Sequence, residues 1–140
     1  MILADTGPIV ALFDRDDQCH ELCLQTIETF HDSLVTTWPV LTECFYLLGF
    51  SWEAQQDLWT FLKRGGLEIF PMDKTHFSQC RDLMHQFRNL PMDLADASLV
   101  VAAGELGIAK IFTLDHRDFS TYRFRKKGQF KLIPPDVRRY

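Results

Sequence analysis

Four acidic side chains stand where metal-dependent chemistry would need them. Asp5 and Asp115 each follow a short apolar run, and Glu43 and Asp96 lie near the N-terminal halves of apolar segments with helical character. In open α/β sheets, ligands bind at the edge formed by the carboxyl ends of the strands. If the four acids converge on one such edge, they form a dense cluster of negative charge.

A cluster of four carboxylates needs a source of positive charge. At an effective dielectric constant near 20, two unit charges ~5 Å apart repel by about 3 kcal/mol. Six such pairs give an upper bound on the order of 20 kcal/mol, which exceeds the ~5–15 kcal/mol stability of a domain. The cluster must therefore protonate, spread out or hold a cation. Oxygen ligands without nearby Cys or His favour Mg²⁺ or Mn²⁺, and such an ion suits phosphodiester hydrolysis.

Each acid also has a plainer structural explanation. Asp5 can cap the helix that follows it, and Asp93 is well placed as an N-cap with Asp96 at the third helical position on the same face. Glu43 can be a solvated helical residue. The recurrence of the pattern at several element ends makes capping alone an insufficient explanation.

Strands and helices alternate along the chain, and these elements must position the acids. Apolar or β-branched runs predict strands at 2–4, 34–37, 67–70, 110–115 and 130–133. Helical spacing predicts helices near 9–13, 17–31, 38–48, 52–64, 74–88 and 93–106, with Thr6 or Gly7 as the first N-cap. This alternation predicts an α/β fold with a parallel sheet.

Composition indicates an ordinary globular protein. The chain has 140 residues, of which 46% are hydrophobic and 24% charged, so we expect a single domain over residues 1–140. Asp5 interrupts the apolar start, and no apolar stretch is long enough to span a membrane, so we expect a cytoplasmic protein without a signal peptide. The four cysteines lack C-x-x-C or zinc-finger spacing.

Charge is distributed unevenly. The net charge is −4, but residues 117–140 carry eight basic side chains against two acidic ones, which leaves −10 on the remainder. A basic end on an acidic body can hold a polyanion near an acidic site, or it can be a solvated tail.

The acid-bearing segments resemble those of the PIN-domain ribonucleases, and among them the short VapC-type toxins of toxin–antitoxin pairs. The resemblance covers nearly the whole chain and rests on the order and spacing of Ile2–Thr6, the Glu43 helix, Asp93–Leu99 and Thr113–Phe119. It implies a three-layer α/β/α fold whose parallel sheet has four to five strands in the order 3-2-1-4-5. The basic stretch 124–128 departs from the family pattern by lengthening the C-terminal end.

The resemblance also implies roles for individual residues. The catalytic acids would be Asp5, Glu43, Asp96 and Asp115, and a Mg²⁺ or Mn²⁺ ion would be held by Asp5, Asp96 and Asp115. Thr6 and Thr113 would be hydroxyls that orient carboxylates, and Asp93 and Asp118 would be accessory acids. The side chains expected to hold the RNA backbone are Arg117, Arg123, Arg125, Lys126 and Lys127.

Partners follow from the same resemblance. VapC-type toxins form homodimers and are inhibited by a small protein antitoxin that covers the site. Aromatic side chains of two helices could supply such an interface, although at helical spacing they are more often core: Phe45, Phe50, Trp52, Trp59 and Phe61.

Three functional hypotheses are consistent with these residues. The first is a metal-dependent endoribonuclease acting as the toxin of a type II toxin–antitoxin system. The second is a catalytically inert PIN-like module that binds RNA or protein. The third is a phosphoacceptor receiver domain, which would need an acceptor Asp after its third strand, where this chain has Phe70-Pro71.

Overall fold

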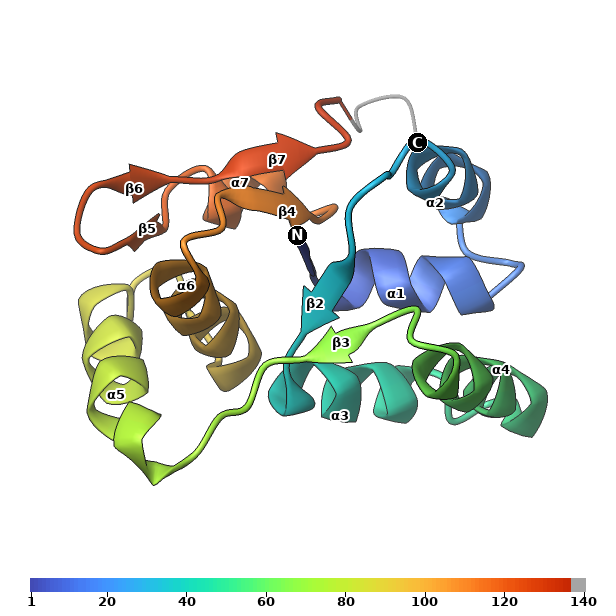
Figure 1. The fold of residues 1–140 in the computed structure, drawn as a ribbon, viewed down its shortest axis with the longest axis horizontal. Coiled ribbons are helices and arrows are strands. Elements are labelled where there is room, and N and C mark those ends of the chain that lie inside the picture. The colour runs from blue at the N-terminus through green and yellow to red at the C-terminus, as the bar shows by residue number, and fades with distance from the viewer. Residues whose placement is uncertain (137–140) are drawn as a thin grey trace.

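The first strand of the chain lies in the middle of a parallel sheet, as its apolar residues require (Figure 1). In the computed structural model, which describes residues 1–136, β1 (Ile2–Ala4) is fully buried between β2 (Leu34–Thr36) and β4 (Lys110–Phe112). The edges are β3 (Glu68–Ile69) and β7 (Lys131–Ile133), and the order is β3-β2-β1-β4-β7. This confirms the predicted α/β class and strand order, with β7 as the fifth strand of the sheet.

Helices flank the sheet on both sides, with α5 and α6 on one side of the view and α1, α2 and α4 on the other (Figure 1). The helical segments are α1 (Thr6–Phe13), α2 (His20–Ile27), α3 (Trp38–Leu47), α4 (Trp52–Lys63), the 3₁₀ turn η1 (Lys74–His76), α5 (Phe77–Gln86), α6 (Leu94–Leu106) and α7 (His116–Phe119). In the described part of the chain, no helix combines the length and the apolar composition that a membrane crossing requires.

Side-chain caps set where the helices begin. Thr37 and Ser51 cap α3 and α4 by accepting backbone N–H groups, as their positions in the sequence predict. Asp93 caps α6, and Gly107 ends that helix in the left-handed conformation with φ 70°.

The first helix corrects one prediction. Its N-cap is Asp5 rather than Thr6 or Gly7, because the Asp5 carboxylate accepts the backbone N–H of the next residue, Thr6, at 2.8 Å. The helix therefore begins directly after the strand, with no intervening turn, and Asp5 is pinned at the junction of the two elements.

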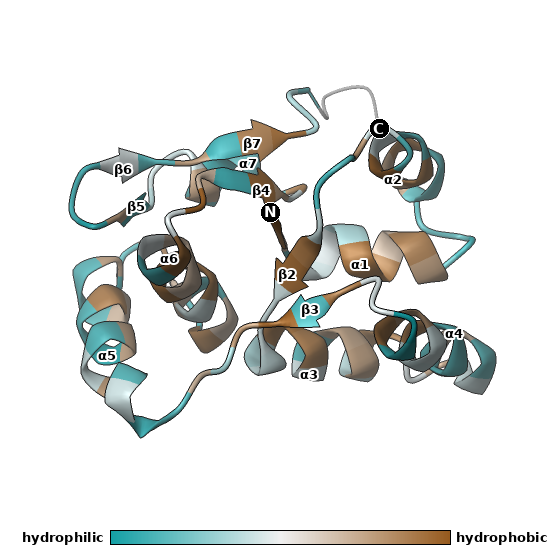
Figure 2. Ribbon diagram, viewed as in Figure 1, coloured by the Kyte–Doolittle hydropathy of each residue, from teal (hydrophilic) through white to brown (hydrophobic). Residues whose placement is uncertain are grey.

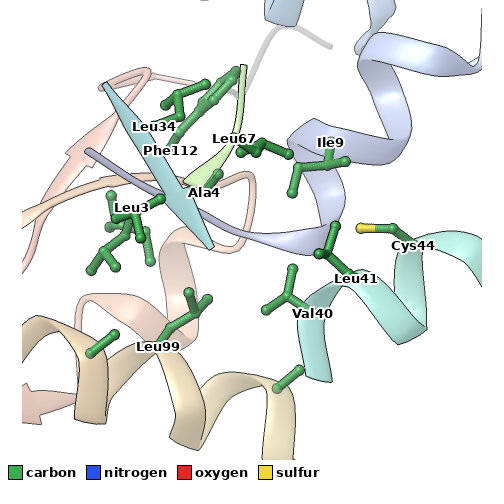
Figure 3. Packing of buried hydrophobic residues seen from close by; sticks show 14 of the residues in the cluster. Leu3, Ala4, Ile9, Leu34, Val40, Leu41, Cys44, Leu67, Leu99 and Phe112 are labelled. Carbon is green, nitrogen blue, oxygen red and sulfur yellow. The ribbon is translucent and has the colours of Figure 1, made fainter. Parts of the chain in front are cut away.

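A continuous apolar core joins the sheet to α1, α3 and α6 (Figure 3). Leu3 of β1, Leu41 of α3 and Leu99 of α6 have no exposed surface. β2 and much of α6 are accordingly among the most hydrophobic parts of the ribbon (Figure 2). The core residues of the sheet, α3 and α6 therefore pack against one another without contact with water.

The basic C-terminal segment contains a hairpin that the sequence patterns did not predict. β5 (Arg123–Phe124) and β6 (Gly128–Gln129) pair in an antiparallel fashion, and the Phe124 ring packs on Phe130 with ring centres 5.1 Å apart. The predicted strand at 110–115 is also shorter, because Thr113 and Asp115 form side-chain bonds beyond its end. Residues 137–140, which include Arg138 and Arg139 of the basic segment, lie outside the described residues.

Candidate active site

The predicted acids gather at the carboxyl edge of the two central strands. β1 and β4 are parallel neighbours, so Asp5 and Asp115 leave the same edge of the sheet. Burial raises the pKa of both Asp5 and Asp96. Negative charge on Asp115 and Glu43 raises the pKa of Asp5 further, and negative charge on Asp93 and Asp5 does the same for Asp96. The fold therefore brings acids from four separate segments into electrostatic contact.

Asp5 is the most deeply buried of these acids, with 7% of its surface exposed. Burial raises its pKa from 3.8 to about 6, and hydrogen bonds from Thr113 and Thr6 oppose that rise. The Thr6 N–H donates to Oδ1 at 2.8 Å, and the Thr113 hydroxyl donates to Oδ2 at 2.8 Å. Both carboxylate oxygens are thus held in one orientation.

Thr113 links the two strand ends directly. Its Oγ1 donates to Asp5 and also accepts the backbone N–H of Asp115 at 2.9 Å. Thr6 contacts Asp5 through its backbone N–H instead of its hydroxyl. Within the described residues, the Thr6 Oγ1 is buried without a hydrogen-bond partner, so a polar group beside Asp5 still has capacity to bond a water or an ion-bound water.

Asp93 and Asp96 form a capping box at the start of α6. Asp93 Oδ1 accepts the Asp96 N–H at 2.8 Å, and Asp96 Oδ2 accepts the Asp93 N–H at 3.4 Å. Burial, followed by the charge of Asp93, raises the pKa of Glu43. Asp93 is therefore a cap, as the plainer explanation predicted, and also the acid that lies beside Glu43.

Tyr122 is a residue of this site that the sequence patterns missed. Its fully buried hydroxyl donates to Asp96 Oδ2 at 3.3 Å. The ring packs against Phe87 and Phe119 with centres 5.2 and 5.1 Å away, and burial raises the pKa of Tyr122, which keeps the hydroxyl protonated as a donor. In the sequence, the segment around Tyr122 is mostly polar and basic. The spacing of three residues between Phe119 and Tyr122 was the only sign that this side chain is buried.

Asp115 and Asp118 face each other at the start of α7. Asp115 Oδ1 accepts the Asp118 N–H at 3.1 Å. Burial and the Asp115 charge raise the pKa of Asp118, while Arg117 opposes the rise with its Nε 4.0 Å from an Asp118 carboxylate oxygen.

The acids have little compensating charge from the chain itself. In the part of the chain that the structure describes, Arg and Lys ion pairs go to Asp82, Asp32 and Asp118 and none to Asp5, Glu43 or Asp96. Also within residues 1–136, no three His, Cys, Asp or Glu side chains stand close enough to bind one ion by themselves. This arrangement fits an ion that keeps several water ligands and is coordinated directly by only one or two carboxylates. Mg²⁺ usually binds to proteins in this way.

The five basic residues predicted to hold RNA do not form one group. Arg117 lies beside the acids, with 85% of its side chain exposed. Arg123 donates from Nη1 to the carbonyls of Ser120, Thr121 and Tyr122, so it fixes the segment that carries Tyr122. Arg123, Arg125 and Lys126 line a cavity against the C-terminal half of α6, and Lys127 is exposed at the next position of the hairpin turn.

A parallel sheet in this order, with buried acids at the carboxyl edge of its central strands, defines a PIN-like α/β protein. The PIN domain family model matches residues 2–125, and the chain belongs to this family.

Relatives of the chain include VapC-type proteins, which confirms the predicted resemblance. The chain is 27% identical to Ribonuclease VapC26 of Mycobacterium tuberculosis (strain ATCC 25618 / H37Rv) over 135 residues, which are 95% of this chain and 100% of the relative. Its fold is similar to the crystal structure of Mycobacterium tuberculosis VapC20, described as a sarcin-ricin loop cleaving toxin. That match has a TM-score of 0.75 and 18% identity, and it covers 84% of this chain and 92% of the other.

Replacing Asp5 with Asn should stabilise the metal-free protein only above the pKa of Asp5, which is about 6. The folded-state pKa values of Asp5 and Asp96, about 6 and about 7, exceed the usual 3.8. The folded state therefore binds more protons than the unfolded state between these values, and the free energy of unfolding falls as pH rises through about 6–7. In urea unfolding with EDTA, Asp5→Asn should gain about 2 kcal/mol over wild type near pH 8 and almost nothing near pH 4. The exposed Asp57→Asn is the matched control, and an equal effect of Asp5→Asn at both pH values would contradict the account.

Removing only the Tyr122 hydroxyl should weaken divalent-metal binding. Tyr122→Phe keeps the ring packing but removes one of the two hydrogen bonds that Asp96 Oδ2 accepts, which raises the pKa of that carboxyl. We expect the Mn²⁺ dissociation constant, measured by calorimetry, to rise about tenfold. Tyr46→Phe, which changes a Tyr that is 83% exposed, should leave it unchanged. Equal affinities of Tyr122→Phe and wild type would show that the hydroxyl does not position Asp96.

Proposed function

We propose that this chain is a divalent-metal-dependent endoribonuclease and the toxin of a type II toxin–antitoxin system. Its membership of the PIN family and the names of its relatives, a ribonuclease and a sarcin-ricin loop cleaving toxin, support this function. The observation that carries it is the buried Asp5 carboxylate, which lies among three further acids and forms no ion pair with a basic side chain of residues 1–136.

The site residues divide the chemistry between them. A bound Mg²⁺ or Mn²⁺ would supply an activated water and neutralise charge on the phosphoryl oxygens. Asp5, Asp96 and Asp115 are the proposed acids of the metal site, of which one or two would bind the ion directly and the others through its waters, and Thr113 and Tyr122 hold two of these acids by hydrogen bonds.

Glu43 is the proposed proton acceptor of the reaction. Its raised pKa, caused by burial and by Asp93, suits it to take up the proton that the attacking water releases. Arg117 is exposed beside the acids and is placed to contact a phosphate of the RNA.

An antitoxin would find an apolar surface on and before α4. Of the aromatic residues predicted to form an interface, Phe50, Trp52 and Trp59 are exposed. Phe45 instead stacks on Trp59 with ring centres 4.4 Å apart, and Phe61 packs on Phe13. We assign the exposed three to an apolar segment of a small antitoxin, since exposed aromatic clusters commonly mark protein interfaces.

A second copy of the chain would find a different apolar surface, the α3–α6 surface. Two adjoining cavities of about 580 and 560 Å³ share Pro39 and Leu94 in their linings, and the first is also lined by Glu43 and Asp93, so this surface borders the acidic site. Tyr46 and Phe77 border them, with 83% and 71% of their surfaces exposed. In a two-fold homodimer, the same surface of each copy contacts the other copy. A protruding aromatic ring beside an apolar cavity suits this arrangement, because the ring of one copy can enter the cavity of the other.

A cytoplasmic location completes the proposal. RNA is the substrate, no membrane is involved, and all four cysteines are free thiols in the structure, a state that the reducing cytosol preserves.

Asp96→Asn should abolish metal-dependent RNA cleavage. The change keeps the side-chain shape but removes a charge that an ion would bind, so we expect a loss of at least about 100-fold in cleavage rate with Mg²⁺ or Mn²⁺. Asp57→Asn should cleave as wild type does. Cleavage by the purified Asp96→Asn protein at the wild-type rate would refute the nuclease site. A wild-type protein that neither cleaves RNA nor is stabilised by millimolar metal would be the inert binding module.

Phe77→Glu should convert the proposed homodimer to a monomer. A charge placed at the rim of the apolar cavities would be buried without a partner in the dimer. The molar mass measured by light scattering should fall by half, whereas Phe50→Glu, on the antitoxin surface, should remain dimeric. A monomeric wild-type protein, or a dimeric Phe77→Glu, would exclude this interface.

A further inference from the structure

A second polar cavity lies away from the acidic site, between the helical pair α5–α6 and the β5–β6 hairpin. We call it the hairpin cavity. Its volume is about 570 Å³, which is in the range of ligand-binding clefts. Its lining includes Gln79, Gln86, Gly104, Arg123, Arg125 and Lys126. The hairpin and its turn, hydrophilic in Figure 2, lie beside α6 in Figure 1.

The lining of the hairpin cavity carries more positive than negative charge, because Arg123, Arg125 and Lys126 stand against Asp82 and Glu105. Asp82 also pairs with Arg81 at 3.1 Å, and Glu105 contacts the His76 ring at 3.2 Å. Among the described residues, the exposed Arg125 and Lys126 form no ion pair. The side-chain amides of Gln79 and Gln86 add hydrogen-bonding capacity, so the lining suits an anionic, polar ligand.

The turn that carries these two cations adopts an unfavourable backbone conformation. Arg125 and Lys126 have φ values of 49° and 71°, in the left-handed region that Gly, Asn and Asp occupy most easily. The hairpin is nevertheless held in place, because Phe124 packs on Phe130 and the Arg125 side chain passes close to Gly104. Long basic residues at strained turn positions are more consistent with a binding role than with a purely structural one.

The distance between the hairpin cavity and the acidic site is set by helix α6, which borders both. Asp96 and Gly104 are on the same helix and are separated by about two turns, or ~12 Å. The neighbouring residues Tyr122 and Arg123 connect the two places, because Tyr122 contacts Asp96 and Arg123 lines the cavity. At ~3.4 Å per nucleotide of a stacked strand, this spacing corresponds to three or four nucleotides.

We propose that the hairpin cavity is an RNA exosite that holds the phosphate backbone of a single strand three or four nucleotides from the bond to be cleaved. The inference rests on the proposed nuclease function for its substrate. The proposal divides RNA binding by the basic segment between two places. Arg117 contacts RNA at the acids, and Arg125 and Lys126 anchor the strand at a distance. The exosite therefore favours RNAs long enough to reach both places.

RNA binding in EDTA tests the exosite without requiring cleavage. Fluorescence anisotropy would compare labelled single-stranded RNA pools of about 20 and about 4 nucleotides. For the longer pool, Arg125→Ala/Lys126→Ala should raise the dissociation constant about tenfold or more and reduce the slope of log affinity against log salt by about 1.4, the value for two lost phosphate contacts. The short pool should bind wild type more weakly than the longer pool does, because it cannot reach both the hairpin cavity and Arg117. Lys63→Ala/Arg64→Ala, which removes two exposed charges at the end of α4, should bind the longer pool as wild type does.

A second variant separates binding from folding. Arg125→Gly/Lys126→Gly removes the same charges and relieves the left-handed strain, so it should raise the melting temperature while weakening RNA binding equally. Unchanged affinity for the longer RNA in both hairpin variants would overturn the exosite. An equal loss of affinity for poly-aspartate would also overturn it, because the cavity would then attract any polyanion. A protein that binds RNA through the hairpin but cleaves none with metal would refute the nuclease function and leave the exosite standing.

Discussion

The hydrogen bond from Thr113 to the buried Asp5 carboxylate is the interaction on which the site depends. It joins the ends of the two central strands, and the same hydroxyl accepts the N–H of Asp115. Asp5 also starts α1 by accepting the N–H of Thr6. One carboxylate thus serves as a helix cap, a link across the sheet and a fixed negative charge at the sheet edge. Burial still raises its pKa to about 6, so these bonds offset only part of the cost of burying it.

The other acids repeat this combination of capping and mutual repulsion. Asp93 and Asp115 cap α6 and α7, yet each stands beside a second carboxyl whose pKa it raises. A protein selected for stability alone would replace one acid of each pair with an amide, which can still accept the capping hydrogen bond. Functional sites are where this kind of local conflict is tolerated, because a bound cation resolves it. The capping and functional explanations of Asp5 and Asp93 are therefore compatible, and the geometry supports both.

The predictable part of the structure is the part governed by local chemistry. The apolar runs marked the five sheet strands, and caps such as Thr37 and Ser51 marked where helices begin. The strand order came from the family resemblance. The features that the sequence patterns missed depend on contacts between segments that are distant in the chain. Tyr122 is recognisable as a site residue only once β5 and α6 are adjacent, and the hairpin that separates Arg125 from Arg117 has no Gly or Asn in its left-handed turn. Net charge along the chain predicted a basic end, but it carries no information about which cations lie near the acids.

The central claim is that this uncompensated acidic edge exists to hold a divalent cation. Crystals grown near neutral pH and soaked in millimolar Mn²⁺ would test it most directly through the anomalous scattering of the metal. We expect one or more strong anomalous peaks in contact with Asp5, Asp96 or Asp115, with waters completing the coordination. Well-diffracting crystals with no anomalous peak at this edge, or with Mn²⁺ bound only elsewhere, would contradict the account.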